Sequence, residues 1–230
     1  MKEQQDKPVI HFLHIGKTGG SAIKHAIKQG CPGSPYRVRF HPHGVNLRDI
    51  PEGEQVVFIV RDPVRRFVSG FYSRQRQGKP RYNIPWRPGE RKAFETFDTP
   101  NHLASALSSW NLSKRKQARL AMKRIQHVKN SYWKWFENEA YFNSRIDDIF
   151  FVAFQEQLAD DFEVLKDMLG CPSSASLPSD DVKAHRNPGN LDTSLNKKSV
   201  ANLEKWYRRD YRFMDLSRRV RASLESRKTG

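Results

Sequence analysis

The sequence has few cysteines and no long apolar run. Its 230 residues include only Cys31 and Cys171, too few for a disulfide framework or a CxxC metal site. One disulfide stays possible, but reduced cysteines in a reducing compartment are the simpler expectation. The polar start and the short apolar stretch at 9–15 lack the core of a signal peptide or a membrane span. We therefore expect a soluble, cytoplasmic protein, although a truncated lumenal domain would look the same.

Acidic residues are scarce relative to basic ones. The chain has 25 Asp and Glu against 41 Lys and Arg, a net charge of +16. A surplus of this size indicates an anionic partner: nucleic acid, an acidic polymer, a membrane surface or a phosphorylated cofactor. With 37% hydrophobic residues, no internal repeat and no clear linker, the chain is predicted to form a single domain over residues 1–230.

The order of the expected elements is that of an α/β domain. Strands are predicted at 9–15, 36–40 and 56–60, and helices begin near Gly20 and at Pro63. The third strand is a run of apolar, mostly β-branched residues, which is typical of a parallel strand covered on both faces.

The rest of the chain is predicted to be mainly helical. Residues 78–100 indicate a surface loop with at most one helical turn, and 113–143 show one long amphipathic pattern. A fourth strand is expected within 147–154, a helix over 155–170 and basic helices over 196–227. The fold class is thus α/β: a P-loop-like parallel sheet flanked by helices, with a largely helical mid-chain insertion and basic C-terminal helices.

The first strand leads into the loop HIGKTGGS, residues 14–21. Its GKT matches the end of a nucleotide-binding P-loop, but that pattern also requires a glycine where this chain has His11. Two glycines follow the lysine instead. A strand that enters a glycine loop and then a helix directs backbone N–H groups and the helix dipole at one point. The loop therefore predicts a phosphate or sulfate site, with an ordinary helix start after a chance GKT as the alternative.

A second motif follows the third strand. VVFIVRDPVRRFVSGFY places Arg61 at the carboxyl end of that strand and Ser69 on the next helix. Ligands of parallel α/β sheets bind where strands end, so both loops are expected at one edge. Arg61 suits bidentate binding of a phosphate. Alternatively, Arg61 and Asp62 form a local ion pair and Ser69 only packs, or Asp62 is the magnesium ligand of a kinase.

These two motifs resemble a known enzyme family. FLHIGKTGGSAI is similar to the 5′-phosphosulfate loop of sulfotransferases that use 3′-phosphoadenosine-5′-phosphosulfate (PAPS), and FIVRDPVRRFVSGFY is similar to their 3′-phosphate motif. The closest pattern is that of the carbohydrate sulfotransferases, including the heparan 2-O-sulfotransferase branch and soluble bacterial relatives. The resemblance implies the sulfotransferase fold and transfer of a sulfuryl group from PAPS to an acceptor hydroxyl, with PAP as product and no metal.

The resemblance also implies roles for single residues. Lys17 would contact the oxygen that bridges phosphate and sulfate and stabilise the departing phosphate. Arg61 and Ser69 would hold the 3′-phosphate, which ATP lacks. Lys183 and Arg186 would touch a phosphate from the long loop that often closes over the cofactor, with a solvated basic loop as an equal alternative. The 5′-phosphate would be held by the loop residues Gly16, Lys17, Thr18, Gly19, Gly20 and Ser21.

Two histidines, His41 and His43, follow the second strand. Sulfuryl transfer needs a group that takes the hydroxyl proton, and histidine suits this near neutral pH. The 2-O-sulfotransferase branch has a similar His-x-His whose second histidine matches His43. We therefore predict His43 as the base and His41 as helper or alternative; two surface histidines are the other possibility. His11 and His14, in the first strand, are expected to be packed and hydrogen-bonded.

The acceptor is predicted only by class. The basic stretches 113–124 and 206–222 would line a groove for an acidic or carbohydrate acceptor, unless they are solvated helix faces. Trp86 and Trp110 are candidates for stacking on a sugar ring. Three other functions stay open: a P-loop-like kinase with ATP and magnesium, a basic nucleic-acid-binding protein, and a PAPS-binding relative without catalysis. The nucleic-acid hypothesis leaves both loop motifs unexplained, and no specific nucleic acid is expected.

Overall fold

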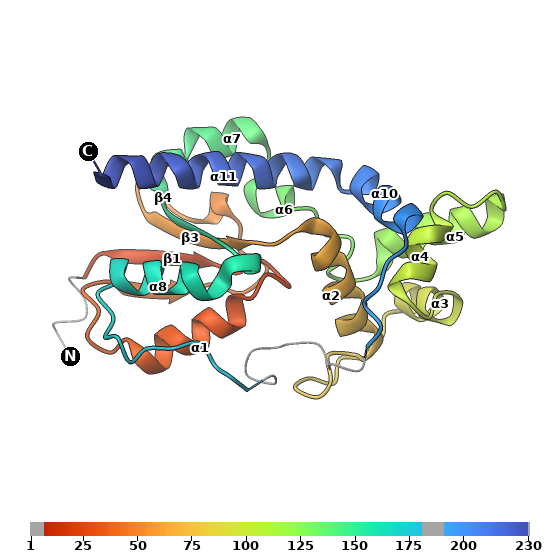
Figure 1. Ribbon diagram of the computed structural model, residues 1–230, viewed down its shortest axis with the longest axis horizontal. Coiled ribbons are helices and arrows are strands. Elements are labelled where there is room, and N and C mark those ends of the chain that lie inside the picture. Colours follow the sequence, from red (N-terminus) through yellow and green to blue (C-terminus); the bar gives the residue numbers. More distant parts are fainter. Residues whose placement is uncertain (1–6, 181–190, 230) are drawn as a thin grey trace. The chain divides into compact units, whose positions relative to one another are not determined.

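A computed structural model describes residues 7–180 and 191–229 of the chain. They divide into two compact units (Figure 1). The first unit consists of Met1–Arg61, Tyr132–His185 and Arg212–Gly230, and the second of Asp62–Ser131 and Arg186–Tyr211. Neither unit is continuous in sequence, because the chain passes between them more than once. The prediction of one domain over 1–230 stays a prediction.

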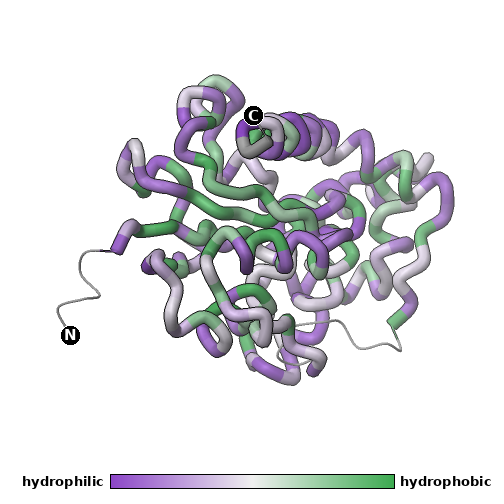
Figure 2. The backbone as a smooth tube through the Cα atoms, turned by 60° about the vertical axis from the view of Figure 1, so that its left-hand side comes forward, coloured by the Kyte–Doolittle hydropathy of each residue, from purple (hydrophilic) through white to green (hydrophobic). Residues whose placement is uncertain are grey.

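The first unit contains a four-stranded parallel sheet in the order β2-β1-β3-β4. The strands are β1 (Val9–Leu13), β2 (Arg37–Phe40), β3 (Gln55–Val60) and β4 (Ile149–Phe154). All four were predicted to within two residues, and the α/β class with a parallel sheet flanked by helices is confirmed. β1, β3 and β4 are mainly apolar and correspond to hydrophobic stretches of the tube in Figure 2, whereas β2 contains Arg37 and Arg39.

Helices cover both faces of this sheet. On one face Ile10 and Phe12 of β1 pack against α1 (Gly20–Gly30) and α8 (Leu158–Met168). The other face is covered by α6 (Trp133–Phe136), α7 (Glu139–Ser144) and α11 (Arg208–Thr229) from residue 212 onward. Because successive side chains of a strand point to opposite faces, the continuous apolar run of β3 serves both layers. Its residues 56–60 are at most 1% exposed.

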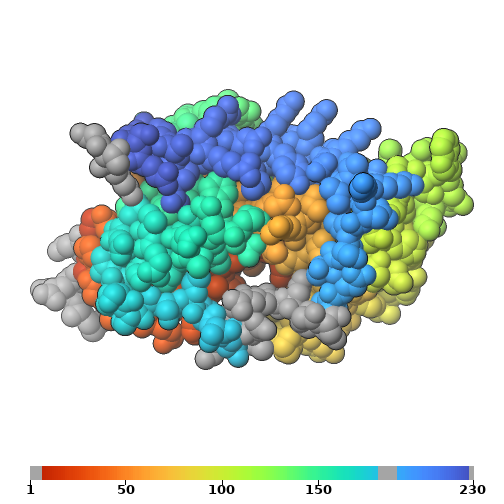
Figure 3. Space-filling view, viewed as in Figure 1, coloured from red at the N-terminus to blue at the C-terminus, as the bar shows by residue number. Residues whose placement is uncertain are grey.

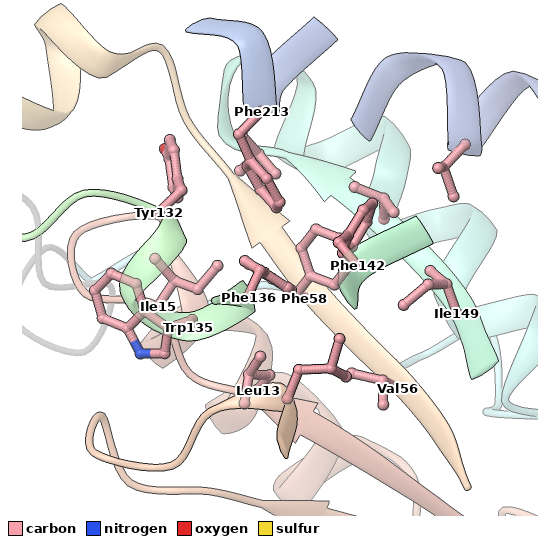
Figure 4. Close-up of a cluster of buried hydrophobic side chains, with 14 of the residues drawn as sticks. Leu13, Ile15, Val56, Phe58, Tyr132, Trp135, Phe136, Phe142, Ile149 and Phe213 are labelled. Atoms are coloured by element: carbon pink, nitrogen blue, oxygen red, sulfur yellow. The ribbon is translucent and has the colours of Figure 1, made fainter. Parts of the chain in front are cut away.

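Phe213 of α11 lies at the centre of the second layer (Figure 4). Its ring stacks on Tyr132 and Phe136 and lies edge-on to Trp133 and Phe142. Burial of each such aromatic ring stabilises the fold by about 1.5–3 kcal/mol, and ring pairs add about 0.5–1.5 kcal/mol. One residue from the C-terminal helix thus joins mid-chain helices to the sheet.

The described part of the second unit is helical. Its helices are α2 (Pro63–Gln75), α3 (Pro88–Thr96), α4 (Pro100–Ala106), α5 (Leu112–Arg124) and α10 (Lys197–Trp206). They pack around a separate cluster that includes Phe67, Phe71 and Phe97. A buried ion pair joins α2 to α3, since Arg74 donates to both carboxylate oxygens of Glu90 at 2.8 and 2.7 Å.

The loop predicted for 78–100 is wrong in its second half, which forms α3. The helix starts with Pro88 in its first turn, and the Glu90 carboxylate accepts a hydrogen bond from the backbone N–H of Arg87. Proline and an acidic residue are favoured in a first helical turn. Ala93 and Phe94 are buried, so packing stabilises this helix. The proline, glycine and charged residues of the segment had indicated a loop instead.

The single helix predicted for 113–143 is also wrong. α5 ends at Arg124, and the backbone N–H of Gln126 donates to the Glu90 carboxylate at 2.9 Å instead of continuing the helix. His127 then has a φ of 66°, which no α-helix continues through. The chain resumes helical structure only in α6 and α7. A contact with a residue 36 positions away therefore sets the end of α5.

Cys31 and Cys171 form a disulfide, so the expectation of reduced cysteines is wrong for this structure. Cys31 follows α1, and Cys171 follows the turn at Gly170 that ends α8, where φ is 62°. The Cα atoms are 4.8 Å apart, within the usual range for a disulfide. The bond joins the ends of two helices on one face of the sheet. Within the described residues, no helix is both long and apolar enough to span a membrane.

We expect removal of this disulfide to destabilise the protein by about 2–5 kcal/mol, because it closes a long loop and restricts the unfolded chain. The variant Cys31→Ala/Cys171→Ala should unfold at a lower urea concentration than the wild type. Reductant should bring the wild type to the same midpoint and leave the variant unchanged. A wild-type midpoint that does not respond to reductant would show that the disulfide is absent or without effect.

Candidate functional site

The candidate site lies at the carboxyl ends of β1 and β3. The chain crosses from β1 to β2 on one side and then returns to form β3 on the other side of β1. Such a reversal leaves a crevice between the two strands, which is where open α/β sheets bind ligands. The loop 14–19 follows β1 and Arg61 follows β3, and Leu13 pairs with Phe58 across the two strands. Both motifs of the first unit therefore emerge at this point.

A hydrogen bond joins the two motifs. Nη1 of Arg61 donates to the backbone oxygen of Lys17 at 3.2 Å. The backbone of Arg61 is held in turn by the Tyr132 hydroxyl, which accepts from its N–H at 3.0 Å and donates to its carbonyl at 2.5 Å. The guanidinium that follows β3 thus contacts the backbone of the loop that follows β1, and a guanidinium at a loop of this kind suits an anion site.

The backbone of the loop has an unusual conformation. Lys17 has a φ of 70° and Gly19 a φ of 94°, and left-handed residues of this kind help direct successive N–H groups into a concavity suited to an anion. α1 then begins at Gly20 with no side-chain cap and no acidic residue in its first turn. No carboxylate of this first turn therefore offsets the positive end of the helix dipole.

Close packing explains the two glycines. A Cβ at Gly20 would lie 2.8 Å from the His14 ring, and one at Gly19 would lie 2.9 Å from the side chain of Leu158. Real Cβ atoms do not approach other atoms so closely, and Gly19 also needs its positive φ. The absent P-loop glycine is not required, because His11 lies within β1.

Thr18 departs from its expected role. Its side chain is buried and its hydroxyl donates to the Ile15 carbonyl at 3.0 Å. Because a hydroxyl has one hydrogen, it is not a donor for a bound anion in this conformation. Ser21 is partly exposed, so Ser21 and not Thr18 is the candidate hydroxyl donor of the loop. Gly16 is buried next to Lys17, which is partly exposed.

His43 lies beside this loop. Its Nδ1 is 2.9 Å from the His14 carbonyl, so Nδ1 carries the proton and donates, and Nε2 is the acceptor in the neutral ring. The Trp135 indole donates to the His43 carbonyl at 3.0 Å and holds the segment. The ring has a solvent-exposed edge, yet surrounding protein desolvates it. This desolvation, followed by repulsion from Lys17, lowers the pKa of His43 despite the opposing His14 hydrogen bond.

His41 has a different environment. It is buried, and its Nε2 lies 2.8 Å from Nδ1 of His11. Nε2 of His11 in turn donates to the Glu54 carboxylate. Desolvation lowers the pKa of His41, and the neighbouring His11 and Arg39 lower it further. The hydrogen-bonded chain Glu54–His11–His41, in which both histidines are buried and Glu54 is partly exposed, thus fixes the orientation of the His41 ring.

Sequence reasoning predicted a packed His11 but missed Glu54. The carboxylate belongs to the turn PEGEQ before β3, and no local pattern marks it as a partner of a histidine. The parallel register sets His11 opposite Val56, so Glu54 is two residues from the pairing position. Only strand pairing brings this carboxylate to the ring.

Three further predicted residues are not placed in this region. Ser69 is buried on α2 and belongs to the second unit, and its role at a 3′-phosphate stays a prediction. Lys183 and Arg186 lie outside the described residues. Asp62 caps α2, accepting from the Arg65 N–H at 2.8 Å and from the Tyr211 hydroxyl at 3.0 Å. This is a structural role for the carboxylate that a kinase would use for magnesium.

We expect His43 to titrate below the ordinary histidine value of 6.5. Since its folded pKa is lowered, its contribution to stability is present above pH 6.5 and is lost as the pH falls through the folded pKa. Lys17→Met should raise the pKa of His43, because it removes a nearby cation. NMR titration of the ring checks both statements. Lys28→Met, at the exposed end of α1, is the control and should leave His43 unchanged.

No protein-family model matches the chain, and the search of curated proteins gave no significant match. Function is therefore inferred from the geometry of the site and from the resemblance of its two motifs to those of sulfotransferases.

Proposed function

We propose that the protein is a PAPS-dependent sulfotransferase that acts on a hydroxyl group of an acidic or carbohydrate acceptor. The observation that carries this proposal is the junction of the two motifs. Arg61 donates to the backbone of Lys17 where β1 and β3 end. A strand pair, an uncapped helix start and two cations form a site for a phosphosulfate group. The finer assignment to the sulfotransferase fold belongs to the same proposal.

In the proposed reaction, different residues of the first unit bind the phosphate, stabilise the leaving group and accept the proton. The loop backbone from Gly16 to Ser21 and the start of α1 bind the 5′-phosphate, and Lys17 stabilises negative charge on the departing phosphate. PAPS, when bound, supplies the activated sulfuryl group. The acceptor oxygen forms the new bond to sulfur, the bond from sulfur to the bridging oxygen breaks, and PAP leaves. The hydroxyl proton passes to Nε2 of His43, which is unprotonated in the neutral ring.

The alternatives are less well supported by the same contacts. A kinase would need a magnesium ligand, and Asp62 is engaged as the cap of α2. A protein that only binds nucleic acid would have no need of the strained loop at Lys17 and Gly19.

The disulfide bears on the compartment. Disulfides persist in oxidising surroundings and are rare in the cytosol. With Cys31 bonded to Cys171, we favour the lumenal alternative over the cytoplasmic location first expected. Reaction of native and reduced protein with a thiol reagent, followed by mass measurement, distinguishes paired from free cysteines.

PAP should bind without metal, and ATP with magnesium should bind much more weakly. Arg61→Ala should weaken PAP binding by about 1.5–3 kcal/mol, the range for a hydrogen bond to a charged group. Lys17→Ala should abolish transfer and leave the circular dichroism unchanged. Calorimetric titration with PAP and with ATP–magnesium measures the affinities, and Lys28→Ala is the charge-matched control. A preference for ATP–magnesium would support the kinase, and binding of neither would end the proposal.

His43→Ala should slow transfer by about 10²–10⁴-fold with little change in PAP affinity. His41→Ala should instead lower stability, because it removes the hydrogen-bond partner of the buried Nδ1 of His11. Release of PAP in the presence of a pool of uronate-containing oligosaccharides measures transfer, and urea unfolding measures stability. The opposite pattern, with transfer lost only in His41→Ala, would make His41 the base.

A further inference from the structure

A basic groove lies on the second unit, formed by the segment before α5 together with α5 and α10. Figure 3 shows these helices side by side, α5 in yellow-green and α10 in blue. The cavity has a volume of about 630 Å³, within the range of ligand sites. No acidic residue lines it. The residues that matter for its chemistry are Trp110, Arg115, Arg119, Lys123, Lys205 and Trp206.

Three of these cations form a row along α5. Arg115, Arg119 and Lys123 recur every four residues and therefore lie on one face of the helix, about 6 Å apart along its axis. A second, smaller hollow of about 350 Å³ shares the same three residues. The row thus forms a ridge between two hollows, accessible to a ligand from either side.

The stability of α5 does not explain this row. Like charges four residues apart destabilise a helix by about 0.2–0.5 kcal/mol per pair. The first turn of α5 also carries cations and no acidic residue, contrary to the helix dipole. Within the described parts of the chain, Arg115, Arg119, Lys123 and Lys205 form no ion pair. An external anion would offset this repulsion.

Trp110 adds a flat apolar surface at the rim. Its side chain is 97% exposed, which is rare for the largest hydrophobic residue. Trp206, on the opposite side, is half-buried against the core of the second unit. One fully presented ring beside a row of cations suits a ligand that alternates apolar ring faces with negative groups.

We propose that this groove binds an anionic saccharide, a chain of uronate or sulfated sugars, with a sugar ring on Trp110 and its carboxylates or sulfates on Arg115, Arg119 and Lys123. The choice of a saccharide rests on the proposed function, which requires a hydroxyl-bearing acceptor. Single-stranded nucleic acids are bound through several exposed aromatic rings in succession, and this groove presents one. The groove is therefore a saccharide-binding site of the second unit, separate in its residues from the PAPS loop.

Calorimetry with a defined uronate-containing octasaccharide tests the proposal. Arg115→Glu/Arg119→Glu should weaken binding at least tenfold, and Trp110→Ala should weaken it several-fold. Neither change should disturb the fold, because all three side chains lie at the surface; circular dichroism verifies this. The control Arg212→Glu/Arg219→Glu makes the same charge change at exposed positions of α11 and should leave the affinity within twofold.

Two further ligands sharpen the test. A neutral octasaccharide should not bind, and a single-stranded oligonucleotide of equal charge should bind more weakly than the acidic octasaccharide. Tighter binding of the oligonucleotide, with loss in the α5 variant, would overturn the proposal in favour of a nucleic-acid surface. Equal loss in the α5 and α11 variants would overturn it in favour of unspecific attraction by net charge.

A PAP titration of the same proteins separates the two proposals. Loss of saccharide binding in the α5 variant with PAP binding present in the wild type supports both. Saccharide binding without any PAP binding would remove the proposed sulfotransferase function and leave the groove. PAP binding without saccharide binding would remove the groove and leave the enzyme.

Discussion

The parallel pairing of β1 with β3 is the constraint on which the candidate site depends. It sets Leu13 beside Phe58 and so brings the ends of both strands to one place. The hydrogen bond from Arg61 to the Lys17 carbonyl spans the two loops that follow. Tyr132 holds the Arg61 backbone by two further hydrogen bonds. A shift in the register of β3 against β1 would move Arg61 along the sheet edge and separate it from Lys17.

The two histidines after β2 lie two residues apart and have very different surroundings. His41 is fixed through His11 to the Glu54 carboxylate and is buried. His43, two residues later, has its Nδ1 on the His14 carbonyl and an edge open to solvent. Desolvation lowers the pKa of both rings, and of the two residues only His43 is exposed. Residues two apart in a regular extended chain point to the same side, and the turn that begins at His43 breaks this pattern.

The surplus of basic residues is distributed over parts of the structure in which the cations have different surroundings. Part of it, Lys17 and Arg61, lies in the candidate site. Another part lies on α5 and beside it on α10, where no acid lines the groove. On α11, in contrast, Arg221 is paired with Asp161 and Glu225, so part of its charge serves the fold. The cations of α5 and α11 thus differ in whether they have acidic partners, which the composition of the chain does not show.

The sequence by itself determined the strands, the helix starts at Gly20 and Pro63, and the two motifs of the site. These signals are local, since apolar runs, glycines and capping residues act within a few positions of the chain. Tertiary structure decided the rest. It ended α5 through Glu90, turned the Thr18 hydroxyl inward, brought Glu54 to His11 and joined the two cysteines. Each of these four features depends on a contact with a residue elsewhere in the fold. No local sequence pattern identifies that partner, because packing of the tertiary structure brings the two residues together.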